Sequence, residues 1–365
     1  MTDGHCRVSW KELYMPKDLF AYRGHCGAGI SAISWSPDGT FLASGDYRGR
    51  VHIWNARTGE GSLVTYRNHR ASSIMDIDWS PDSRHLAFAY DGTIIVWGGN
   101  TEEGPLAEYR EHPSTFNVDV WSPDHQHLAF ICASNGAIKV WEANTGKDPL
   151  VVYRGHLQAV RYGHVCSLDW SPDGAFLVSS DYNGTVQIWD ARSGEGPLQT
   201  FAGGGYSLSV AWSPHGRLIA TTCVDCSVRV YEAMGRSSPL VVYWGHVTGI
   251  EGVNAASWSP DSRFLATAGN DATVQVWEAT VGDPPLLTHT GQRGSFLSFT
   301  SWSPDGRFIA SGGHSSVPIH IWNARTGQVY AIFKNPPFVS ALAWSPESRR
   351  IAIGRGKGIY IWKVI

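Results

Sequence analysis

The sequence has few of the features that mark secreted, membrane-spanning or nucleic-acid-binding proteins. Its six cysteines are scattered over 365 residues, which is too sparse for a disulfide framework, so we expect a reducing compartment. The 29 basic and 32 acidic residues give a formal net charge of −3 without any lysine- or arginine-rich run, so neither nucleic acid nor an anionic membrane is expected as a partner. No stretch approaches the ~20 apolar residues of a membrane-spanning helix, and no signal-peptide pattern is present. We therefore expect a cytoplasmic protein.

Tryptophan and glycine are abundant instead, with 17 and 40 copies. The tripeptide Trp-Ser-Pro occurs eight times, at intervals of 42 to 49 residues, and a second aromatic residue follows each copy after 18 to 20 residues. The first set of aromatic residues is Trp35, Trp79, Trp121, Trp170, Trp212, Trp258, Trp302 and Trp344. The second set is Trp54, Trp97, Trp141, Trp189, Tyr231, Trp277, Trp322 and Trp362. A fixed period of this kind is typical of a repeat architecture.

Each repeat alternates strand-like and turn-like segments. In the first repeat, the alternating segments ISAISW, TFLAS and RVHIW are separated by the turn sequences SPDG and GDYRG. Ser-Pro-Asp-Gly suits a hairpin because proline fixes φ, aspartate caps the turn and glycine accepts a positive φ. A fourth short run, SLVTYR, follows a loop, and such runs are often closed by Gly-His or a related pair. The pattern predicts four antiparallel strands in each repeat and an all-β fold.

These features resemble the WD-repeat family of β-propellers, and the resemblance extends over residues 18 to 363. It implies a ring of four-stranded blades around a central channel, with the Trp-Ser-Pro strand innermost and the strand before Gly-His outermost in the preceding blade. Eight sets of three inner strands and eight outer strands predict eight blades. The last set lacks a following outer strand, so residues 18–23 are expected to complete it and close the ring. Seven blades are the alternative if one unit is irregular.

The predicted domain organisation is a single β-propeller of eight repeats over residues 18–365. Residues 1–17 lie before the first outer strand, and within them residues 7–10 (RVSW) read like the third strand of a further unit. We therefore interpret residues 1–17 as an N-terminal extension or a repeat remnant. The propeller is expected to be either free-standing or a module of a longer chain.

The family pattern also implies a structural hydrogen-bonded set in each blade. It consists of a histidine before the inner strand, a hydroxyl on the second strand, an aspartate six residues before the tryptophan, and that tryptophan on the third strand. The residues that match it are His246, Thr267, Asp271 and Trp277. The resemblance implies packing rather than hydrolysis for this set. Asp46 and Asp181 lie two residues earlier than the pattern requires, and whether they reach His25 and His156 is open.

No other motif predicts a catalytic or metal site. Cys223 and Cys226 form one CxxC pair, but zinc would need two further ligands and no second pair exists. The spacings G-x-S-x-G and H-E-x-x-H are absent from the sequence. We therefore expect no enzymatic activity, no cofactor and no metal.

Recognition is expected where the repeats differ, in the loops before the inner strands and the turns between the second and third strands. Tyrosine and arginine in such places are typical of interaction hot spots, and loops carry specificity on rigid scaffolds. The predicted partner-binding residues are Tyr47, Arg48, Tyr90, Arg161, Tyr162, Tyr182, Asn183, Trp244, Glu251 and His314. The sequence therefore predicts a non-enzymatic scaffold that binds a protein or peptide on the rim. The alternative is a small-ligand-binding or hydrolytic propeller that uses the central channel. The oligomeric state is not predicted.

Overall fold

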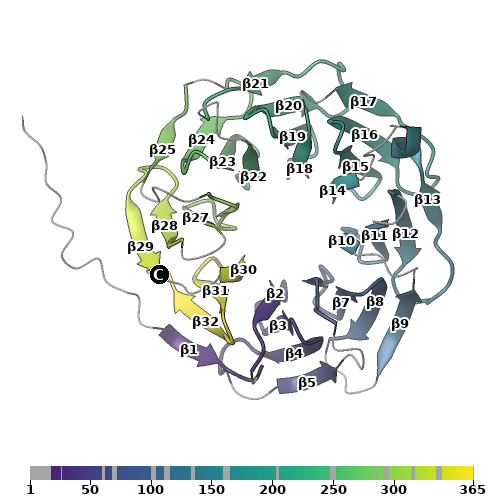
Figure 1. The fold of residues 1–365 in the computed structure, drawn as a ribbon, viewed down its shortest axis with the longest axis vertical. Coiled ribbons are helices and arrows are strands. Elements are labelled where there is room, and N and C mark those ends of the chain that lie inside the picture. The colour runs from purple at the N-terminus through teal and green to yellow at the C-terminus, as the bar shows by residue number, and fades with distance from the viewer. Residues whose placement is uncertain are drawn as a thin grey trace, which may run out of the picture.

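The fold is a closed ring of β-sheets. The computed structural model describes residues 18–25, 27–59, 62–67, 72–99, 104–110, 116–132, 136–158, 165–202, 205–246, 252–282, 284–290, 296–313, 317–333 and 339–364. In these ranges 32 strands form eight four-stranded sheets, arranged as the blades of a propeller (Figure 1). The prediction of eight blades is confirmed, and the seven-blade alternative is wrong.

Each blade runs from the centre of the ring to its circumference in the order of its strands. The innermost strands are β2 (Ile30–Trp35), β6 (Asp76–Trp79), β10 (Phe116–Trp121), β14 (Val165–Trp170), β18 (Ser207–Trp212), β22 (Val253–Trp258), β26 (Phe299–Trp302) and β30 (Val339–Trp344). The second strands are β3 (Phe41–Asp46), β7 (His85–Tyr90), β11 (His127–Cys132), β15 (Phe176–Asp181), β19 (Leu218–Cys223), β23 (Phe264–Gly269), β27 (Phe308–Gly312) and β31 (Arg350–Arg355).

The outer half of each blade consists of a third and a fourth strand. The third strands are β4 (Arg50–Asn55), β8 (Thr93–Gly98), β12 (Ala137–Glu142), β16 (Thr185–Asp190), β20 (Val228–Glu232), β24 (Val274–Glu278), β28 (Ile319–Asn323) and β32 (Gly358–Lys363). The outermost strands are β5 (Ser62–Arg67), β9 (Pro105–Arg110), β13 (Val151–Tyr153), β17 (Gln199–Ala202), β21 (Val241–Tyr243), β25 (Leu287–His289), β29 (Val329–Phe333) and β1 (Asp18–Tyr22). We number the blades I (β2–β5) to VII (β26–β29) in chain order, and blade VIII contains β30, β31, β32 and β1. Within the described ranges the only helical element is one 3-10 turn, η1 (Gly155–Gln158), and no helix there is long and apolar enough to cross a membrane.

Blade VIII joins the two ends of the described chain. Strand β1 pairs antiparallel with β32, with Asp18 opposite Trp362 and Tyr22 opposite Ile359. The Tyr22 ring also stacks on Trp54 of blade I, with ring centroids 4.5 Å apart. β1 therefore holds blade VIII by backbone hydrogen bonds and blade I by side-chain packing.

The same side-chain packing recurs between other blades. Tyr153 of blade III stacks on Trp189 of blade IV, with centroids 4.4 Å apart, and its hydroxyl donates to Gln187 over 2.9 Å. Tyr243 of blade V stacks on Trp277 of blade VI at 4.4 Å. The recurrent outer-strand tyrosine thus packs against the second set of aromatic residues, which explains why both recur with one period.

The first set of aromatic residues connects the inner strands. The indole Nε1–H of Trp35 donates to the carbonyl of Ala343 over 3.1 Å, and that of Trp258 donates to Ala211 over 3.2 Å, in each case across a blade boundary. Among the described residues, one cluster of buried apolar side chains lies at each of the eight boundaries between blades. The core is therefore divided into interfaces between wedges, as expected for a repeat protein.

The Ser-Pro turns are held by their own side chains. Ser36 Oγ accepts from the amide of Phe41 over 2.8 Å and donates to Asp38 over 2.6 Å. Gly39 adopts a φ of +70° in this turn, and Ser83 takes the corresponding position of the next blade at +61°. The hydroxyl of Ser83 accepts from the amide of Asp38 over 3.0 Å. A serine in this strained conformation therefore links the turns of two neighbouring blades.

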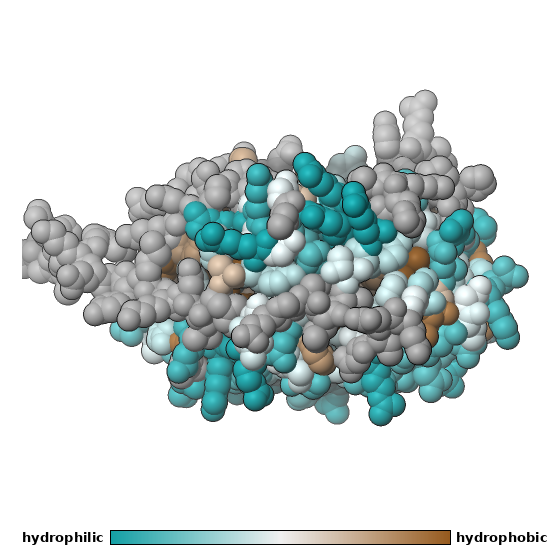
Figure 2. Space-filling view, turned by 90° about the horizontal axis from the view of Figure 1, so that it is seen from below, coloured by the Kyte–Doolittle hydropathy of each residue, from teal (hydrophilic) through white to brown (hydrophobic). Residues whose placement is uncertain are grey.

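The antiparallel order of the strands gives the disc two faces. The "loop face" carries the loops before the inner strands and the turns between second and third strands. The "Ser-Pro face" carries the Trp-Ser-Pro turns and the loops between third and outermost strands. Figure 2 views the disc from its edge and shows polar side chains projecting on both faces, with apolar spots on the circumference between them.

Candidate functional site

The set of side chains in blade VI forms a continuous hydrogen-bonded chain. His246 lies 2.8 Å from Thr267 Oγ1 through Nε2 and 3.1 Å from Asp271 Oδ2 through Nδ1. Trp277 Nε1–H donates to Thr267 Oγ1 over 3.3 Å. His246, Thr267 and Trp277 are all buried. Because the hydroxyl is enclosed inside the blade, this arrangement suits packing and not attack on a substrate.

Blades I and IV contain the same network with the aspartate two residues earlier. Asp46 lies 2.9 Å from His25 Nδ1, and Ser44 Oγ lies 2.8 Å from His25 Nε2. In blade IV, Asp181 lies 2.9 Å from His156 Nδ1. Both aspartates end the second strand of their blade, whereas Asp271 of blade VI lies in the turn that follows.

Gly269 explains why blade VI can use the later position. It ends β23 and corresponds to Asp46 of blade I. A Cβ atom at Gly269 would lie 2.6 Å from His246 Nδ1 and 2.9 Å from Asp271 Oδ1, both shorter than a van der Waals contact. One blade therefore has room for an aspartate at the end of the strand or in the turn, but not at both.

Asp46 is held as a buried carboxylate. Burial opposes its ionisation, but hydrogen bonds from His25 and from the amides of Arg50 and Arg48 outweigh this and lower the pKa of Asp46 to about 2. Arg50 Nε also donates to it over 2.7 Å. Every one of these partners belongs to the blade itself, so the charge is used for stability.

The loop face exposes several of the predicted binding residues. Tyr47 is 50% exposed and Arg48 is exposed beside it in the turn of blade I. Tyr182 and Asn183 are exposed in the corresponding turn of blade IV. Trp244, which follows β21, is 53% exposed. These residues belong to different blades, so they form separate patches and not one continuous site.

Tyr90 is a correction to the predicted surface. It is only 7% exposed, and its hydroxyl lies 2.8 Å from that of Tyr66 on the outermost strand of the preceding blade. Tyr90 therefore packs between blades I and II and is not available to a partner. The predicted residues Arg161, Tyr162, Glu251 and His314, and the predicted extension 1–17, lie outside the described residues.

Sequence reasoning missed Tyr206, which precedes β18 on the loop face. It is 51% exposed and meets the ring of Tyr182 edge-on, with centroids 6.3 Å apart. Gly29 and Gly252 occupy the corresponding position before β2 and β22. Two of the eight repeats have glycine at this position, whereas Phe296 and Phe338 are aromatic like Tyr206. An aromatic residue in the loop before an inner strand is the signal that could have revealed it.

The CxxC pair provides no metal centre in the described part of the chain. Cys223 ends β19 and Cys226 lies in the following turn, and both are buried and outside any disulfide. Within the described ranges, no group of three potential ligands gathers around them or elsewhere.

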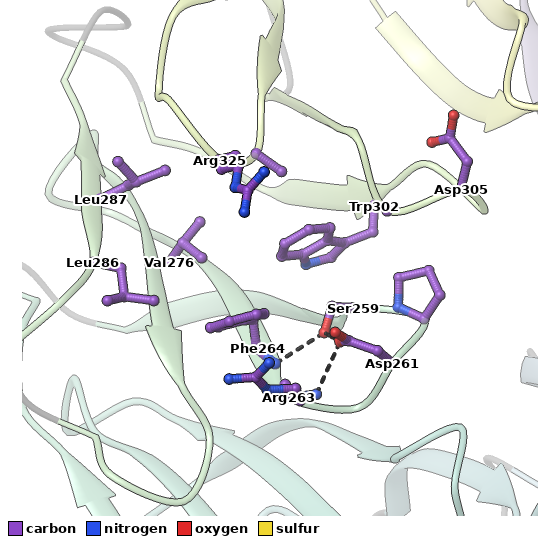
Figure 3. A pocket seen from close by; sticks show the side chains of 13 residues that line it. Ser259, Asp261, Arg263, Phe264, Val276, Leu286, Leu287, Trp302, Asp305 and Arg325 are labelled. Carbon is purple, nitrogen blue, oxygen red and sulfur yellow. Dashed lines mark hydrogen bonds between the residues drawn. The ribbon is translucent and has the colours of Figure 1, made fainter.

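The Ser-Pro face contains a groove between blades VI and VII, with a volume of about 700 Å³. Its apolar lining includes the side chains of Phe264, Val276, Leu286, Leu287 and Trp302. Figure 3 shows the guanidinium groups of Arg263 and Arg325 on opposite sides, with the rings of Phe264 and Trp302 between them. The groove thus combines apolar surface with charged groups, as binding sites for small groups commonly do.

Comparison with known proteins identifies the repeat. The family model described as "WD domain, G-beta repeat" (WD40) matches residues 16–55, 61–98, 103–142, 147–190, 195–232, 237–278 and 284–322, which is more than half of the chain. Each matched segment ends on a third strand, and the inner strands of blade VIII lie outside the seven matches. No curated protein matches the sequence.

Three solved structures share the fold. The computationally designed Ika8 protein is 22% identical with a TM-score of 0.77, covering 95% of this chain and 98% of its own. The C-terminal WD40 domain of Sif2 is 14% identical with a TM-score of 0.81, covering 96% of this chain and 99% of its own. Chaetomium thermophilum Sqt1, bound to the N-terminus of the ribosomal protein L10, is 17% identical with a TM-score of 0.79, covering 96% of this chain and 100% of its own. At these identities the likeness establishes the fold alone.

Proposed function

Because the chain belongs to the WD40-repeat family, whose propellers commonly bind proteins or peptides, we propose that it is a non-enzymatic interaction scaffold. Its partner is a protein or peptide that docks on the loop face. The similarity to Sqt1, which was solved with a ribosomal-protein N-terminus, supports this class of partner. The nearly neutral charge balance favours such a partner over nucleic acid or an anionic membrane. The scattered cysteines favour a cytoplasmic setting.

The observation that carries the proposal is the exposed aromatic pair of Tyr182 and Tyr206. Both rings lie on the loop face at the boundary of blades IV and V, and they are 39% and 51% exposed. A tyrosine offers a large rigid surface with one hydroxyl, and side chains of this kind dominate interface energetics. The pair supports docking at this boundary, and the exposed Tyr47 of blade I forms a separate patch on the same face.

The inner strands do not favour a hydrolytic channel. Asp169 accepts from the amide of Trp212 over 2.7 Å, and Asp78 accepts from Ser34 Oγ over 3.1 Å. Each of these hydrogen bonds links the inner strands of two neighbouring blades. These carboxylates therefore act between blades in the described structure, and the loop face is the better supported site.

Affinity capture tests the proposal. We would compare the wild type with a Tyr47→Ala, Tyr182→Ala and Tyr206→Ala triple variant, using lysate of the source organism and quantitative mass spectrometry. Tyr330→Ala is the matched control, because Tyr330 is 50% exposed but lies on the outermost strand β29. We expect the triple variant to lose at least ~10-fold in recovered partner, which corresponds to about 1.4 kcal/mol, while the control does not. Equal recovery with all three proteins would refute docking on the loop face.

A further inference from the structure

The groove on the Ser-Pro face has an occupied counterpart elsewhere in the ring. Blades VIII and I meet in the same way as blades VI and VII, and there the side chain of Arg350 fills the corresponding space. Its guanidinium carbon lies 4.8 Å from the centre of the Trp35 ring. The side chain is only 16% exposed.

Three further groups hold Arg350 in place. Nη1 donates to the carbonyl of Ala56 over 2.7 Å, and Nη2 lies 3.5 Å from the carbonyl of Gly39. Glu347 Oε1 accepts from Nε over 2.7 Å. One aromatic face, two backbone carbonyls and one carboxylate therefore form a complete guanidinium site within the protein.

All four groups recur in the groove between blades VI and VII. Counting from the Trp-Ser-Pro motifs, Trp302 corresponds to Trp35 and Asp261 to Glu347. Gly306 and Ala324 take the places of Gly39 and Ala56, whose carbonyls hold Arg350. All four line the groove.

The groove lacks only the guanidinium itself. Phe264 begins β23 where Arg350 begins β31, and its ring cannot donate hydrogen bonds. In the described part of the chain neither the Gly306 nor the Ala324 carbonyl accepts a hydrogen bond from another residue. Asp261 uses Oδ1 in its own turn, accepting from Ser259 Oγ over 2.6 Å and from the amide of Arg263 over 3.1 Å. Three acceptors therefore remain available beside one aromatic face.

The two arginines at the groove do not exclude another cation. Arg263 and Arg325 correspond to Arg349 and Arg57 at the boundary of blades VIII and I, where Arg350 is nevertheless accommodated. Arg263 is also 64% exposed and lies 3.8 Å from Glu278, and exposed charges are screened by solvent. The site of Arg350 therefore has the same two arginines nearby as the empty groove.

We propose that the groove between blades VI and VII binds an arginine side chain of a partner peptide. The guanidinium would stack on Trp302 and donate to Asp261 and to the two carbonyls, as Arg350 does in its own site. The apolar side chains of Leu286 and Leu287 would contact the methylene stem. The inference rests on the proposed function as a peptide-binding scaffold, but places this contact on the opposite face from the tyrosines.

Ligand-observed NMR with small probes tests the site directly. The probes are N-acetyl-arginine methylamide, its lysine counterpart and its citrulline counterpart, which has nearly the same shape without the charge. We expect the arginine probe to bind the wild type with a Kd on the order of 1 mM, and the citrulline probe at least ~10-fold more weakly. The lysine probe should also bind more weakly, because an ammonium group cannot match a planar fork. Equal binding of the arginine and citrulline probes would overturn the proposal.

The comparison of the two sites suggests one variant that should close the groove and a second substitution that should restore binding. Phe264→Arg should fill the groove from within, as in blade VIII, and weaken the arginine probe at least ~10-fold. Adding Arg350→Phe to Phe264→Arg should open the site between blades VIII and I and restore binding of the arginine probe. Asp261→Asn, which keeps the turn acceptor, is a milder variant that should weaken binding several-fold. Unchanged binding in Phe264→Arg, with a melting temperature showing that it folds, would contradict the assignment.

Probe binding and affinity capture together distinguish failure of the groove proposal from failure of the loop-face proposal. The triple tyrosine variant should lose captured partner but bind the arginine probe normally. If probe binding is absent in the wild type while capture still depends on the tyrosines, the groove assignment alone is wrong. If the probe binds but capture is insensitive to the tyrosines, the loop-face proposal alone is wrong.

Discussion

Replacing Asp46 with asparagine tests whether a buried charge holds blade I together. The carboxylate is 0% exposed and hydrogen-bonded to His25, and its pKa is lowered from 3.8 to about 2. Since one pKa unit corresponds to about 1.4 kcal/mol, ionisation of Asp46 stabilises the fold by roughly 2–3 kcal/mol at pH 7. We expect Asp46→Asn to lower the free energy of unfolding by this amount.

The pH dependence follows from the direction of the shift. The folded pKa lies below the unfolded one, so the contribution is complete above about pH 5 and is lost as the pH falls through 2, with roughly half remaining at pH 3. Urea unfolding at pH 7 and at pH 3, followed by tryptophan fluorescence and circular dichroism, measures both values. The difference in free energy of unfolding between the wild type and Asp46→Asn should therefore be about half as large at pH 3 as at pH 7.

Asp225→Asn is the control for this experiment. Asp225 is 24% exposed and pairs with Arg229 over 3.2 Å, so its loss should cost less than about 1 kcal/mol. If Asp46→Asn lowers the free energy of unfolding by less than about 1 kcal/mol at pH 7, or by the same amount at both pH values, the stabilising role of the ionised carboxylate is refuted.

Three further predictions concern other parts of the ring. Asp271→Asn should lower the thermal midpoint more than Asp225→Asn, its positional equivalent in blade V, because it disrupts a buried histidine network worth about 1–3 kcal/mol; equal midpoints would argue against the network. Burial and a neighbouring carboxylate raise the pKa of Asp78 to about 7, so ionisation of Asp78 should cost stability as the pH rises from about 4 to 7, and Asp78→Asn should remove this share of the pH dependence and melt higher at pH 8. Tyr22→Ala should cost about 3 kcal/mol and speed amide exchange in β32, an effect that Tyr153→Ala should not produce.

The architecture could be predicted because its determinants are local and repeated. The Trp-Ser-Pro turn closes through its own side chains, as Ser36 and Asp38 show. Eight copies of such a turn determine the number of blades without any knowledge of long-range contacts. The network of His246 and Asp271 could likewise be read from spacing, since each member has a fixed place in the repeat.

The functional surface could not be predicted as well, because it depends on contacts between blades. Tyr90 lies in a turn that suggests exposure, but Tyr66 of the preceding blade covers it. The groove beside Trp302 lies between two blades, and Phe264 lines it at the position that Arg350 holds in blade VIII. Neither outcome follows from one repeat alone, since each depends on which side chain the neighbouring wedge contributes.

The pairing of β1 with β32 has a consequence for the biogenesis of the protein. The ribosome delivers Tyr22 early and its partner Ile359 more than 300 residues later, so the ring cannot close before β32 has been synthesised. Until then β1 remains without its sheet, and the Trp54 face of blade I has no blade VIII beside it. Closure of the ring is thus a late folding step with a long loop to close, and it is the stage at which chaperones or domain exchange with a second chain would act.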